Sequence, residues 1–416
     1  MLQDAEVVVI GAGAFGTSTA YHLARLGKRV ALLEKRALVS QTSPRAAGLA
    51  QQVRADVPSM RLAMRSVQKI ERFAAETGQE LTFHQSGSVK VARTSQAAEQ
   101  LHREVERGRA AGLDIQLISA AEARRLAPFL QPDGALALWY CSTDLYLEPR
   151  DLPLAYTRAA AALGVTLLPD TAVNAIGTRD GSIERVITDK GEIRTPVVVD
   201  TAGAWTNVVA AMTGIRVPIV PTRHQLYITE PIAGITAHHP IVRVLDARAY
   251  VRPERGGLMV GGYEPDPLQV DLNTLPAGFQ IADLTLDFEP LRILTESVRD
   301  LFPSLQGAGI AEFRGGLPTM TADGHYILDR VPGVEGFYVV TGCCVGGLST
   351  SPAIGEAMAA WIADGRPPLD LSPFSLRRFG PEPLEDERLR AACTWQYVHF
   401  YSDEQMPADL LRHGSA

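Results

Sequence analysis

Cysteine is scarce in this chain of 416 residues. The four cysteines are Cys141, Cys343, Cys344 and Cys393. They form no CxxC pair and no cysteine–histidine spacing typical of zinc, so structural disulfides and a zinc site are not expected. His238 and His239 are adjacent, and side chains of adjacent residues rarely point at one metal ion. No HExxH motif is present. We therefore predict that the protein holds no metal.

Long apolar runs and basic clusters are also missing. No segment reaches the roughly 18 consecutive apolar residues that a membrane helix needs. The formal net charge is −7 and basic residues are scattered, which argues against a nucleic-acid or anionic-membrane partner. The first residues are acidic and lack the basic region that opens a signal peptide. We expect a soluble, cytoplasmic protein whose partner is a small molecule.

A glycine-rich turn lies between a strand pattern and a helix pattern near the N-terminus. Residues 6–10 (EVVVI) are apolar and mostly β-branched, GAGAFG follows at 11–16, and the next residues have helical periodicity. A second strand pattern ends in Glu34, where a dinucleotide-binding fold places its ribose-binding acid. Together these features predict the first βαβ unit of a dinucleotide-binding domain.

Each part of this motif has a physical role. Gly11 permits the tight turn, Gly13 lets the backbone approach a pyrophosphate, and Gly16 allows close packing of helix and strand. The helix N-terminus offers unpaired N–H groups to phosphates, and Glu34 accepts a hydrogen bond from a ribose hydroxyl. The motif alone does not distinguish NAD from FAD.

The rest of the chain alternates between helix and strand patterns. Helical periodicity covers residues 59–77, 95–111, 152–163 and 289–302. Alternating strands joined by turn residues fill residues 218–262 and predict an inserted antiparallel sheet. Since a chain of this length usually forms more than one domain, we predict an α/β fold with two interleaved domains.

Three segments together carry a resemblance to a known superfamily. They are the glycine turn with its acid, VVVDTAGAWT at 197–206, and TGCCVGGLSTSPAIG at 341–355. The chain resembles, to about residue 375, the superfamily of FAD enzymes that includes glycine oxidase, D-amino-acid oxidase and sarcosine oxidase. Residues 222–231 and 249–264 are similar to the flavin half of dimethylglycine and sarcosine dehydrogenases. The resemblance implies FAD rather than NAD.

The resemblance also implies a domain arrangement. A Rossmann-like FAD-binding domain would be built from discontinuous segments and interleaved with a substrate domain on an antiparallel sheet. We assign residues 1–80, 146–216 and 316–380 to the first domain. We assign residues 81–145 and 217–315 to the second, and 381–416 to a tail whose aromatic residues the sequence does not place.

The implied reaction is oxidation of a C–H bond next to an amine nitrogen, with hydride transfer to flavin N5 and hydrolysis of the imine. We expect an N-methylated or other secondary or tertiary amino acid as substrate. Three alternatives stay open: a D-amino-acid or glycine oxidase that forms a 2-oxo acid, a flavoprotein subunit of a heteromeric amine dehydrogenase, and a plain NAD dehydrogenase. Oxygen or an electron-transfer protein would accept the electrons, and an oligomer or a partner subunit also stays open.

Both known covalent attachments of the flavin are missing. Arg45 stands where dimethylglycine dehydrogenases have a flavin-linked histidine, and Gly316 stands where monomeric sarcosine oxidases have a flavin-linked cysteine. We therefore predict non-covalent FAD. Met259 stands where those oxidases have an oxygen-activating lysine, which slightly favours a dehydrogenase.

Four residues are implied to contact the substrate. His224 and Tyr250 match a histidine and a tyrosine at the amine, where a neutral imidazole can hold or relay the amine proton. Arg54 matches an arginine that clamps the substrate carboxylate through both oxygens. Ser349 replaces the lysine that serves as the second carboxylate-binding group in the family.

The remaining predictions concern the cofactor. Gly342, Gly346 and Gly347 can approach a flavin closely because they lack side chains, while Cys343 and Cys344 fill space near it. The full set of predicted cofactor-binding residues is Gly11, Gly13, Ala14, Phe15, Gly16, Glu34, Lys35, Thr42, Ser43, Arg45, Ala47, Gly48, Leu49, Val173, Ala202, Gly203, Trp205, Gly316, Gly342, Val345, Gly346, Gly347, Leu348, Ser349 and Thr350.

Overall fold

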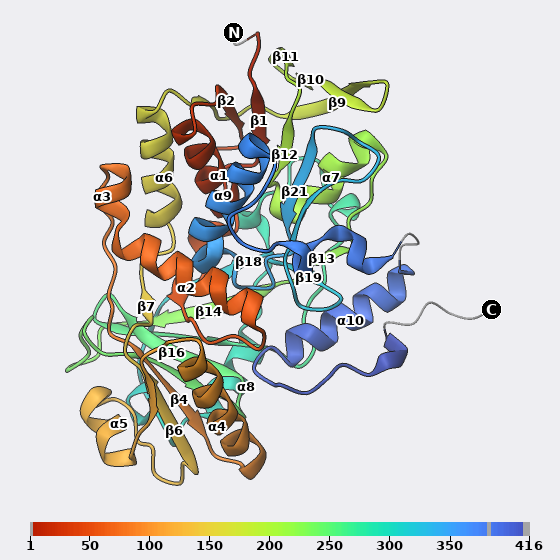
Figure 1. Cartoon of the computed structure of the whole chain (residues 1–416). Helices are drawn as coiled ribbons and strands as arrows, with labels where there is room; N and C mark the ends of the chain where they lie inside the picture. The colour runs from red at the N-terminus through yellow and green to blue at the C-terminus, as the bar shows by residue number, and fades with distance from the viewer. Residues whose placement is uncertain (1–2, 381–383, 411–416) are drawn as a thin grey trace.

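Two large sheets divide the molecule. The structure is a computed structural model that describes residues 3–380 and 384–410. Figure 1 shows one sheet in the upper part, beside α1 and α9, and the other in the lower part. This arrangement confirms the mixed α/β architecture predicted from the sequence.

The upper sheet has six strands and follows the dinucleotide-binding pattern. Its strands, in sheet order, are β20 (Ile327–Arg330), β21 (Phe337–Thr341), β12 (Val198–Asp200), β1 (Val7–Ile10), β2 (Val30–Leu33) and β8 (Thr166–Leu168). All neighbours are parallel except the edge pair β20–β21. The central strands are mostly apolar because both faces of the sheet are covered, one by helices and the other largely by residues 173–194.

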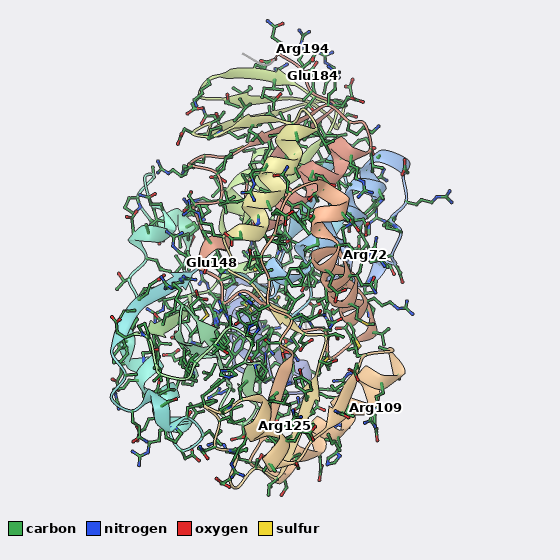
Figure 2. The ribbon with its side chains drawn as sticks, turned by 90° about the vertical axis from the view of Figure 1, so that its left-hand side faces the viewer. Arg72, Arg109, Arg125, Glu148, Glu184 and Arg194 are labelled. Atoms are coloured by element: carbon green, nitrogen blue, oxygen red, sulfur yellow. The ribbon has the colours of Figure 1, made fainter. Side chains whose placement is uncertain are left out.

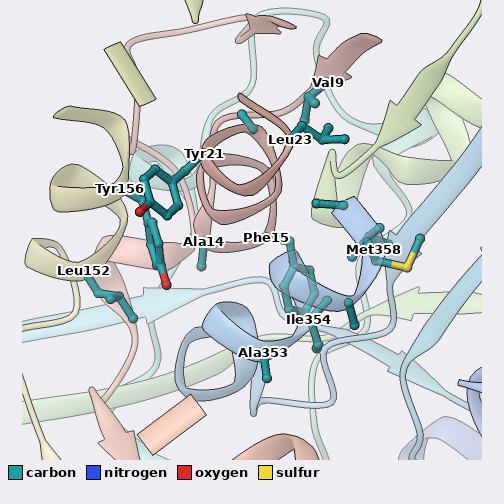
Figure 3. Packing of buried hydrophobic residues seen from close by; sticks show 14 of the residues in the cluster. Val9, Ala14, Phe15, Tyr21, Leu23, Leu152, Tyr156, Ala353, Ile354 and Met358 are labelled. Atoms are coloured by element: carbon teal, nitrogen blue, oxygen red, sulfur yellow. The ribbon is translucent and has the colours of Figure 1, made fainter. Parts of the chain in front are cut away.

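Helices α1 (Ala14–Arg25), α6 (Asp151–Ala162) and α9 (Gly347–Asp364) pack together beside this sheet. The close approach of α1 and α9 depends on a glycine, because a Cβ at Gly355 would lie 2.2 Å from Ser18 Oγ. Figure 3 shows Phe15 of α1 directed towards Ile354 of α9 in this apolar core. The N-termini of α1 and α9 are thereby fixed relative to each other.

The lower sheet has eight strands. In sheet order they are β18 (Ile310–Gly316), β14 (His224–Thr229), β17 (Gly257–Gly262), β16 (Ala249–Glu254), β15 (Ile241–Val244), β4 (Ser88–Ala92), β6 (Ala137–Cys141) and β5 (Ile115–Leu117). Its pairs are antiparallel with one exception, since β15 and β4 run parallel. The strands predicted over residues 218–262 pair antiparallel as expected, and the parallel pair joins β15 to a strand from an earlier part of the chain.

The eight-stranded sheet has two different faces. Helices α5 (Ala120–Leu126) and α8 (Phe288–Ser297) contribute to an apolar core on one face, together with Val242 and Val244. Helix α4 (Ser95–Ala110) packs with Trp139 and Cys141 on the other face. Because side chains alternate along a strand, Arg243 projects from the face opposite to Val242 and Val244.

The strands of the two sheets come from alternating stretches of the chain. The six-stranded sheet takes residues 7–33, 166–200 and 327–341, whereas the eight-stranded sheet takes residues 88–141 and 224–316. We retain the division into an FAD-binding and a substrate-binding domain as a proposal on this basis.

Smaller elements connect the sheets. A tight hairpin turns at Asp180 and Gly181, and both residues have positive φ. The connecting elements are α2 (Val57–Glu71), α3 (Phe73–Thr77), α7 (Thr206–Ala210), β3 (Leu49–Ala50), β7 (Leu145–Tyr146), β9 (Val173–Arg179), β10 (Ser182–Thr188), β11 (Gly191–Arg194), β13 (Ile219–Pro221) and β19 (Thr319–Thr321). The helix predicted over 59–77 is therefore two helices, interrupted at Arg72.

The C-terminal tail forms helix α10 (Asp386–Val398), which contacts β13 and β19. Leu389, Cys393 and Tyr397 of this helix are buried in the same apolar cluster as Trp139. The sequence did not predict this packing. Residues 381–383 and 411–416 of the predicted tail lie outside the described residues.

Charged side chains of both signs are spread along the molecule. Figure 2 shows Arg194 and Glu184 at one end and Arg109 and Arg125 at the other. Across residues 3–380 and 384–410, no helix is long and apolar enough to cross a bilayer.

An ionic cluster fixes the start of α2. His325 Nε2 lies 3.2 Å from Asp56 Oδ2, and Asp56 caps α2 by accepting a hydrogen bond from the Ser59 amide at 2.7 Å. Hydrogen bonds to Asp323 and to Asp56 raise the pKa of His325 to about 9. Arg378 donates to both oxygens of Asp323. The charged imidazolium thereby links two segments that are 267 residues apart, residues 56 and 323.

His325→Gln tests this link. Because the folded-state pKa is raised, the stabilisation is fully present below about pH 6.5 and is lost as pH rises through about 9. We expect the variant to be less stable by about 1–2 kcal/mol at pH 6, after allowance for the partly exposed ring, and equal to wild type at pH 10. Urea unfolding at both pH values measures this, with the exposed His102→Gln as control. An equal deficit at both pH values contradicts the assignment.

Candidate active site

A cavity of about 370 Å³ runs between the two sheets. One end is formed by the glycine turn after β1, and the other by His224 and Tyr250 of the eight-stranded sheet. All residues that we predicted from sequence for the cofactor and the substrate line this cavity, except Gly16, Gly342 and Thr350. The fold therefore brings together residues from segments that span most of the chain.

The three exceptions have other roles. A Cβ at Gly16 would lie 1.8 Å from the carbonyl oxygen of Gly11, so Gly16 permits the close packing of helix and turn. Gly342 has a φ of +64°, and a Cβ there would lie 2.6 Å from a Thr321 methyl group, so this glycine is needed for backbone shape. Thr350 is buried and donates from its hydroxyl to the Gly346 carbonyl at 3.0 Å.

The nucleotide end of the cavity is ordered by Glu34. Its carboxylate accepts hydrogen bonds from the Ala12 amide at 2.9 Å and the Arg36 amide at 3.0 Å. Burial raises the pKa of Glu34 despite these bonds. Ser43 accepts from the amide of Ala14, at the first turn of α1, at 3.0 Å, and no side chain of the N-cap residue closes this helix. The turn and the helix N-terminus are thus held in a shape that can receive a pyrophosphate.

The glycine loop after β21 forms a second wall. Cys343 lines the cavity, and the Sγ of Cys344 lies 3.3 Å from Thr321 Oγ1. Burial raises the pKa of Cys343, and it raises that of Cys344 to about 12, so both thiols are protonated at neutral pH. Cys344 and Val345 have positive φ, at +41° and +64°, which bends the backbone into the start of α9. The loop shapes the wall through its backbone.

The end of the cavity at the eight-stranded sheet contains a histidine between two tyrosines. His224 Nε2 lies 3.1 Å from Tyr250 Oη, and Nδ1 lies 2.8 Å from Tyr397 Oη. All three side chains are buried. Burial lowers the pKa of His224 to about 4, so the ring is neutral at pH 7. A neutral imidazole has one N–H, so one tyrosine hydroxyl accepts from His224 and the other donates to it.

A glycine makes the contact between Tyr250 and His224 possible. Tyr250 is on β16 and His224 on β14, and β17 lies between these strands. Gly261 of β17 pairs with Tyr250, and a Cβ there would lie 2.3 Å from Tyr250 Oη. The missing side chain leaves a gap through which the phenol crosses β17 to reach the imidazole.

Arg54 lines the same end of the cavity. Among the described residues, no acidic side chain forms an ion pair with its guanidinium, which makes a long 3.5 Å contact to the Val53 carbonyl. The capped start of α2 at Asp56 fixes the backbone that presents it. The arginine is therefore available to an anion. Ser349 donates its hydroxyl to the Gly346 carbonyl at 3.0 Å and is buried.

Sequence reasoning missed several residues of the cavity. Arg243 of β15 and the tail residues Phe400 and Tyr401 line it, and Tyr397 holds His224. An arginine in the apolar strand at 240–246 was a signal that could have been followed. The aromatic tail was noticed, but nothing local predicted where it packs.

The charges around the cavity are unequal. Glu34 is the sole acid among the lining residues that the structure describes, while Lys35, Arg36, Arg45, Arg54 and Arg243 are basic. No group of three histidine, cysteine or acidic side chains within the described residues is arranged to hold a metal ion. The cavity favours anionic ligands.

Comparison with known proteins identifies the family. The family described as FAD dependent oxidoreductase (DAO) matches residues 6–361. This chain belongs to the DAO family of FAD-dependent oxidoreductases. The chain is 34% identical over 406 residues to mouse mitochondrial sarcosine dehydrogenase, covering 96% of this chain and 44% of the relative. The chain therefore spans less than half the length of that relative.

Two further comparisons cover nearly whole chains. The chain is 25% identical over 395 residues to sarcosine oxidase subunit beta of Rhodobacter capsulatus, covering 93% of this chain and 91% of that subunit. It superposes on L-proline dehydrogenase from P. horikoshii with a TM-score of 0.83 and 28% identity, covering 92% of this chain and all of that chain. The resemblance inferred from the sequence is confirmed at the level of the family.

The cavity residues fit FAD. The N-terminus of α1 and the Gly11–Gly13 turn can take the pyrophosphate, and Glu34 lies beside them, where a ribose-binding acid is expected. The cavity continues from there past the glycine loop to His224, which leaves room for a long planar cofactor. At the position of the cysteine attachment, a Cβ on Gly316 would lie 2.8 Å from a Thr42 methyl group, so the site is too crowded for that residue. Non-covalent binding stays a prediction.

Gly261→Ala tests the contact across β17. The added methyl group would displace the Tyr250 phenol from His224, so we expect flavin reduction by an amine substrate to slow about 100-fold or more, while bound FAD is retained. Anaerobic stopped-flow absorbance measures the rate. Gly278→Ala is the matched control, because its Cβ would meet nothing within 4 Å. A variant that reduces its flavin at the wild-type rate contradicts the role of this contact.

Proposed function

We propose that this protein oxidises the C–N bond of an N-methylated or other secondary or tertiary amino acid, with release of a demethylated amine and an aldehyde. The observation that carries the proposal is the neutral His224 held between Tyr250 and Tyr397 in a cavity that also contains Arg54. Membership of the DAO family and the similarity to a sarcosine dehydrogenase support it.

The chain's own residues prepare the substrate for oxidation. Arg54 binds the carboxylate and so orients the carbon chain. A neutral imidazole does not repel an ammonium as a charged one would. Its two nitrogens are bonded to Tyr250 and Tyr397, so a proton that leaves the amine reaches the imidazole only through a tyrosine hydroxyl. Tyr250 lines the cavity and bonds Nε2 of the imidazole, so its hydroxyl is the group that connects His224 to the cavity.

Bound FAD supplies the two-electron acceptor for the C–H bond next to nitrogen. The protein's task at this step is to exclude water, and the stacked rings of Tyr263 and Phe400, with centroids 4.5 Å apart, close this side of the cavity. Water must enter afterwards to hydrolyse the imine to amine and aldehyde. Met259 is fully buried and packs with Leu226 and Ile228, so no cation stands there to activate oxygen.

A second candidate is a flavoprotein subunit of a heteromeric amine-oxidising enzyme. The nearly end-to-end match with a sarcosine oxidase subunit beta favours it. Absorbance distinguishes the two: a flavin bleached by an amine in the isolated chain supports the enzyme, and a bound flavin that no amine reduces supports the subunit.

Anaerobic bleaching of the flavin against a substrate panel tests the proposed function. We expect N-methyl amino acids to bleach the flavin and to yield formaldehyde, because Arg54 and His224 line the same cavity. D-amino acids and glycine, which would yield ammonia and a 2-oxo acid, serve as the comparison set. Ammonia release without formaldehyde across the panel would overturn the proposal in favour of an amino-acid oxidase.

A further inference from the structure

The tyrosine bonded to the second nitrogen of His224 leads away from the cavity. His224 and Tyr250 are among the residues that line the cavity, and Tyr397 of α10 is not. Tyr250 bonds to Nε2 of the imidazole, and the Tyr397 hydroxyl lies 2.8 Å from Nδ1. A proton that enters the imidazole from Tyr250 can therefore leave it along a hydrogen bond only towards Tyr397.

Glu264 lies behind this tyrosine. It directly follows Tyr263, whose ring meets the ring of Tyr397 edge-on with centroids 5.1 Å apart. Burial raises the pKa of Tyr397, the charge of Glu264 adds to this effect, and a hydrogen bond from the Glu264 backbone opposes it. Both the backbone and the carboxylate of Glu264 thus act on the hydroxyl that bonds to His224.

One oxygen of the Glu264 carboxylate lacks a hydrogen-bond donor. The residue is 5% exposed, and its Oε2 pairs with Nη2 of Arg223 at 3.2 Å. Oε1 is buried, and no group in the described part of the chain donates to it. Leaving a buried carboxylate oxygen unsatisfied is destabilising, so this oxygen is ready to receive a proton or a donor.

The ion pair of Glu264 connects it to the surface. Nη2 of Arg223 also lies 4.0 Å from Oδ2 of Asp287, whose side chain is 51% exposed. The two residues that follow Glu264 in the chain are exposed as well. Burial raises the pKa of Glu264, and Arg223 acts in the opposite direction. A carboxylate with a raised pKa close to solvent can take up a proton and release it to water.

Glu264 also determines where the imidazole carries its proton. A hydroxyl has one proton to donate and can accept at its oxygen. When Tyr397 directs its proton at the Glu264 carboxylate, its oxygen accepts from Nδ1–H of His224, and Nε2 keeps its lone pair for the Tyr250 hydroxyl. The opposite order would leave Oε1 of Glu264 without a donor. The arrangement therefore favours the Nδ1–H tautomer.

We propose that the proton released by the substrate amine leaves the cavity through Tyr250, His224 and Tyr397 and is taken up by Glu264. The amine proton passes to the Tyr250 oxygen, and the Tyr250 proton passes to Nε2. The Nδ1 proton passes to the Tyr397 oxygen, and the Tyr397 proton passes to the carboxylate, which later loses it to water. No electrons move along this path. Glu264 touches no substrate and acts as a positioning residue through Tyr397, and the inference rests on the proposed function.

Flavin reduction by N-methylglycine in the FAD-loaded protein, without oxygen, tests the path. Glu264→Gln replaces the acceptor by an amide of the same shape that cannot take up the proton. We expect reduction to slow about tenfold or more and the Kd of N-methylglycine to change less than about twofold. The solvent deuterium isotope effect should rise to about 2 or more, because proton release becomes rate-limiting. Asp266→Asn makes the same change at an exposed acid and should behave as wild type.

A double-mutant cycle separates the path from an independent structural effect. Tyr397→Phe interrupts the path one step earlier, so the double variant Glu264→Gln/Tyr397→Phe should be no slower than Tyr397→Phe alone. Slowing factors that multiply in the double variant would overturn the inference. A wild-type rate and isotope effect in Glu264→Gln would overturn it as well.

The tautomer of His224 gives a second test that needs no substrate. Nitrogen-15 NMR of the histidine rings, with the His224 signals assigned by their loss in His224→Asn, should show the proton on Nδ1. A proton on Nε2 overturns the inference, and this measurement decides if Glu264→Gln does not retain FAD. An Nδ1 proton in a protein whose flavin no amine reduces supports the order of hydrogen bonds and contradicts the proposed function. Bleaching by N-methylglycine at the wild-type rate in Glu264→Gln does the reverse.

Discussion

The hydrogen bond of 2.8 Å between His224 and Tyr397 joins the eight-stranded sheet to helix α10, and the chemistry of the cavity depends on it. It occupies one imidazole nitrogen, while Tyr250 occupies the other from the opposite direction. The ring is thereby fixed in one plane and shielded from water, and this burial lowers the pKa of His224 to about 4. A histidine on an open strand would be partly charged near neutral pH and would repel a substrate ammonium.

The interleaved chain brings the two halves of the site together. The six-stranded sheet presents the glycine turn, the N-terminus of α1 and the loop before α9 to one end of the cavity. The eight-stranded sheet presents His224, Tyr250 and Arg243 to the other. Buried strands of the two sheets carry or directly precede these groups, so the fold sets the distance between the two ends of the cavity.

The parts predicted from sequence are those with local signals. GAGAFG at 11–16 and its distant partner Glu34 follow a fixed spacing, which comes from the geometry of one βαβ unit. The residues that were missed depend on contacts between distant segments. Arg243 faces the cavity because β15 pairs with β4 and β16, and Tyr397 reaches His224 because α10 packs on β13 and β19. No pattern within either segment specifies these partners.

The pH dependence of flavin reduction tests the central claim, a neutral imidazole at the amine, most directly. Stopped-flow reduction by N-methylglycine without oxygen gives the rate constant divided by Kd across pH 5.5–9.5. His224 does not titrate in this range. The logarithm of the rate constant divided by Kd should therefore rise with unit slope towards the pKa of the substrate amine, about 10, without a break. A break near pH 6.5 that disappears in His224→Asn would contradict the account.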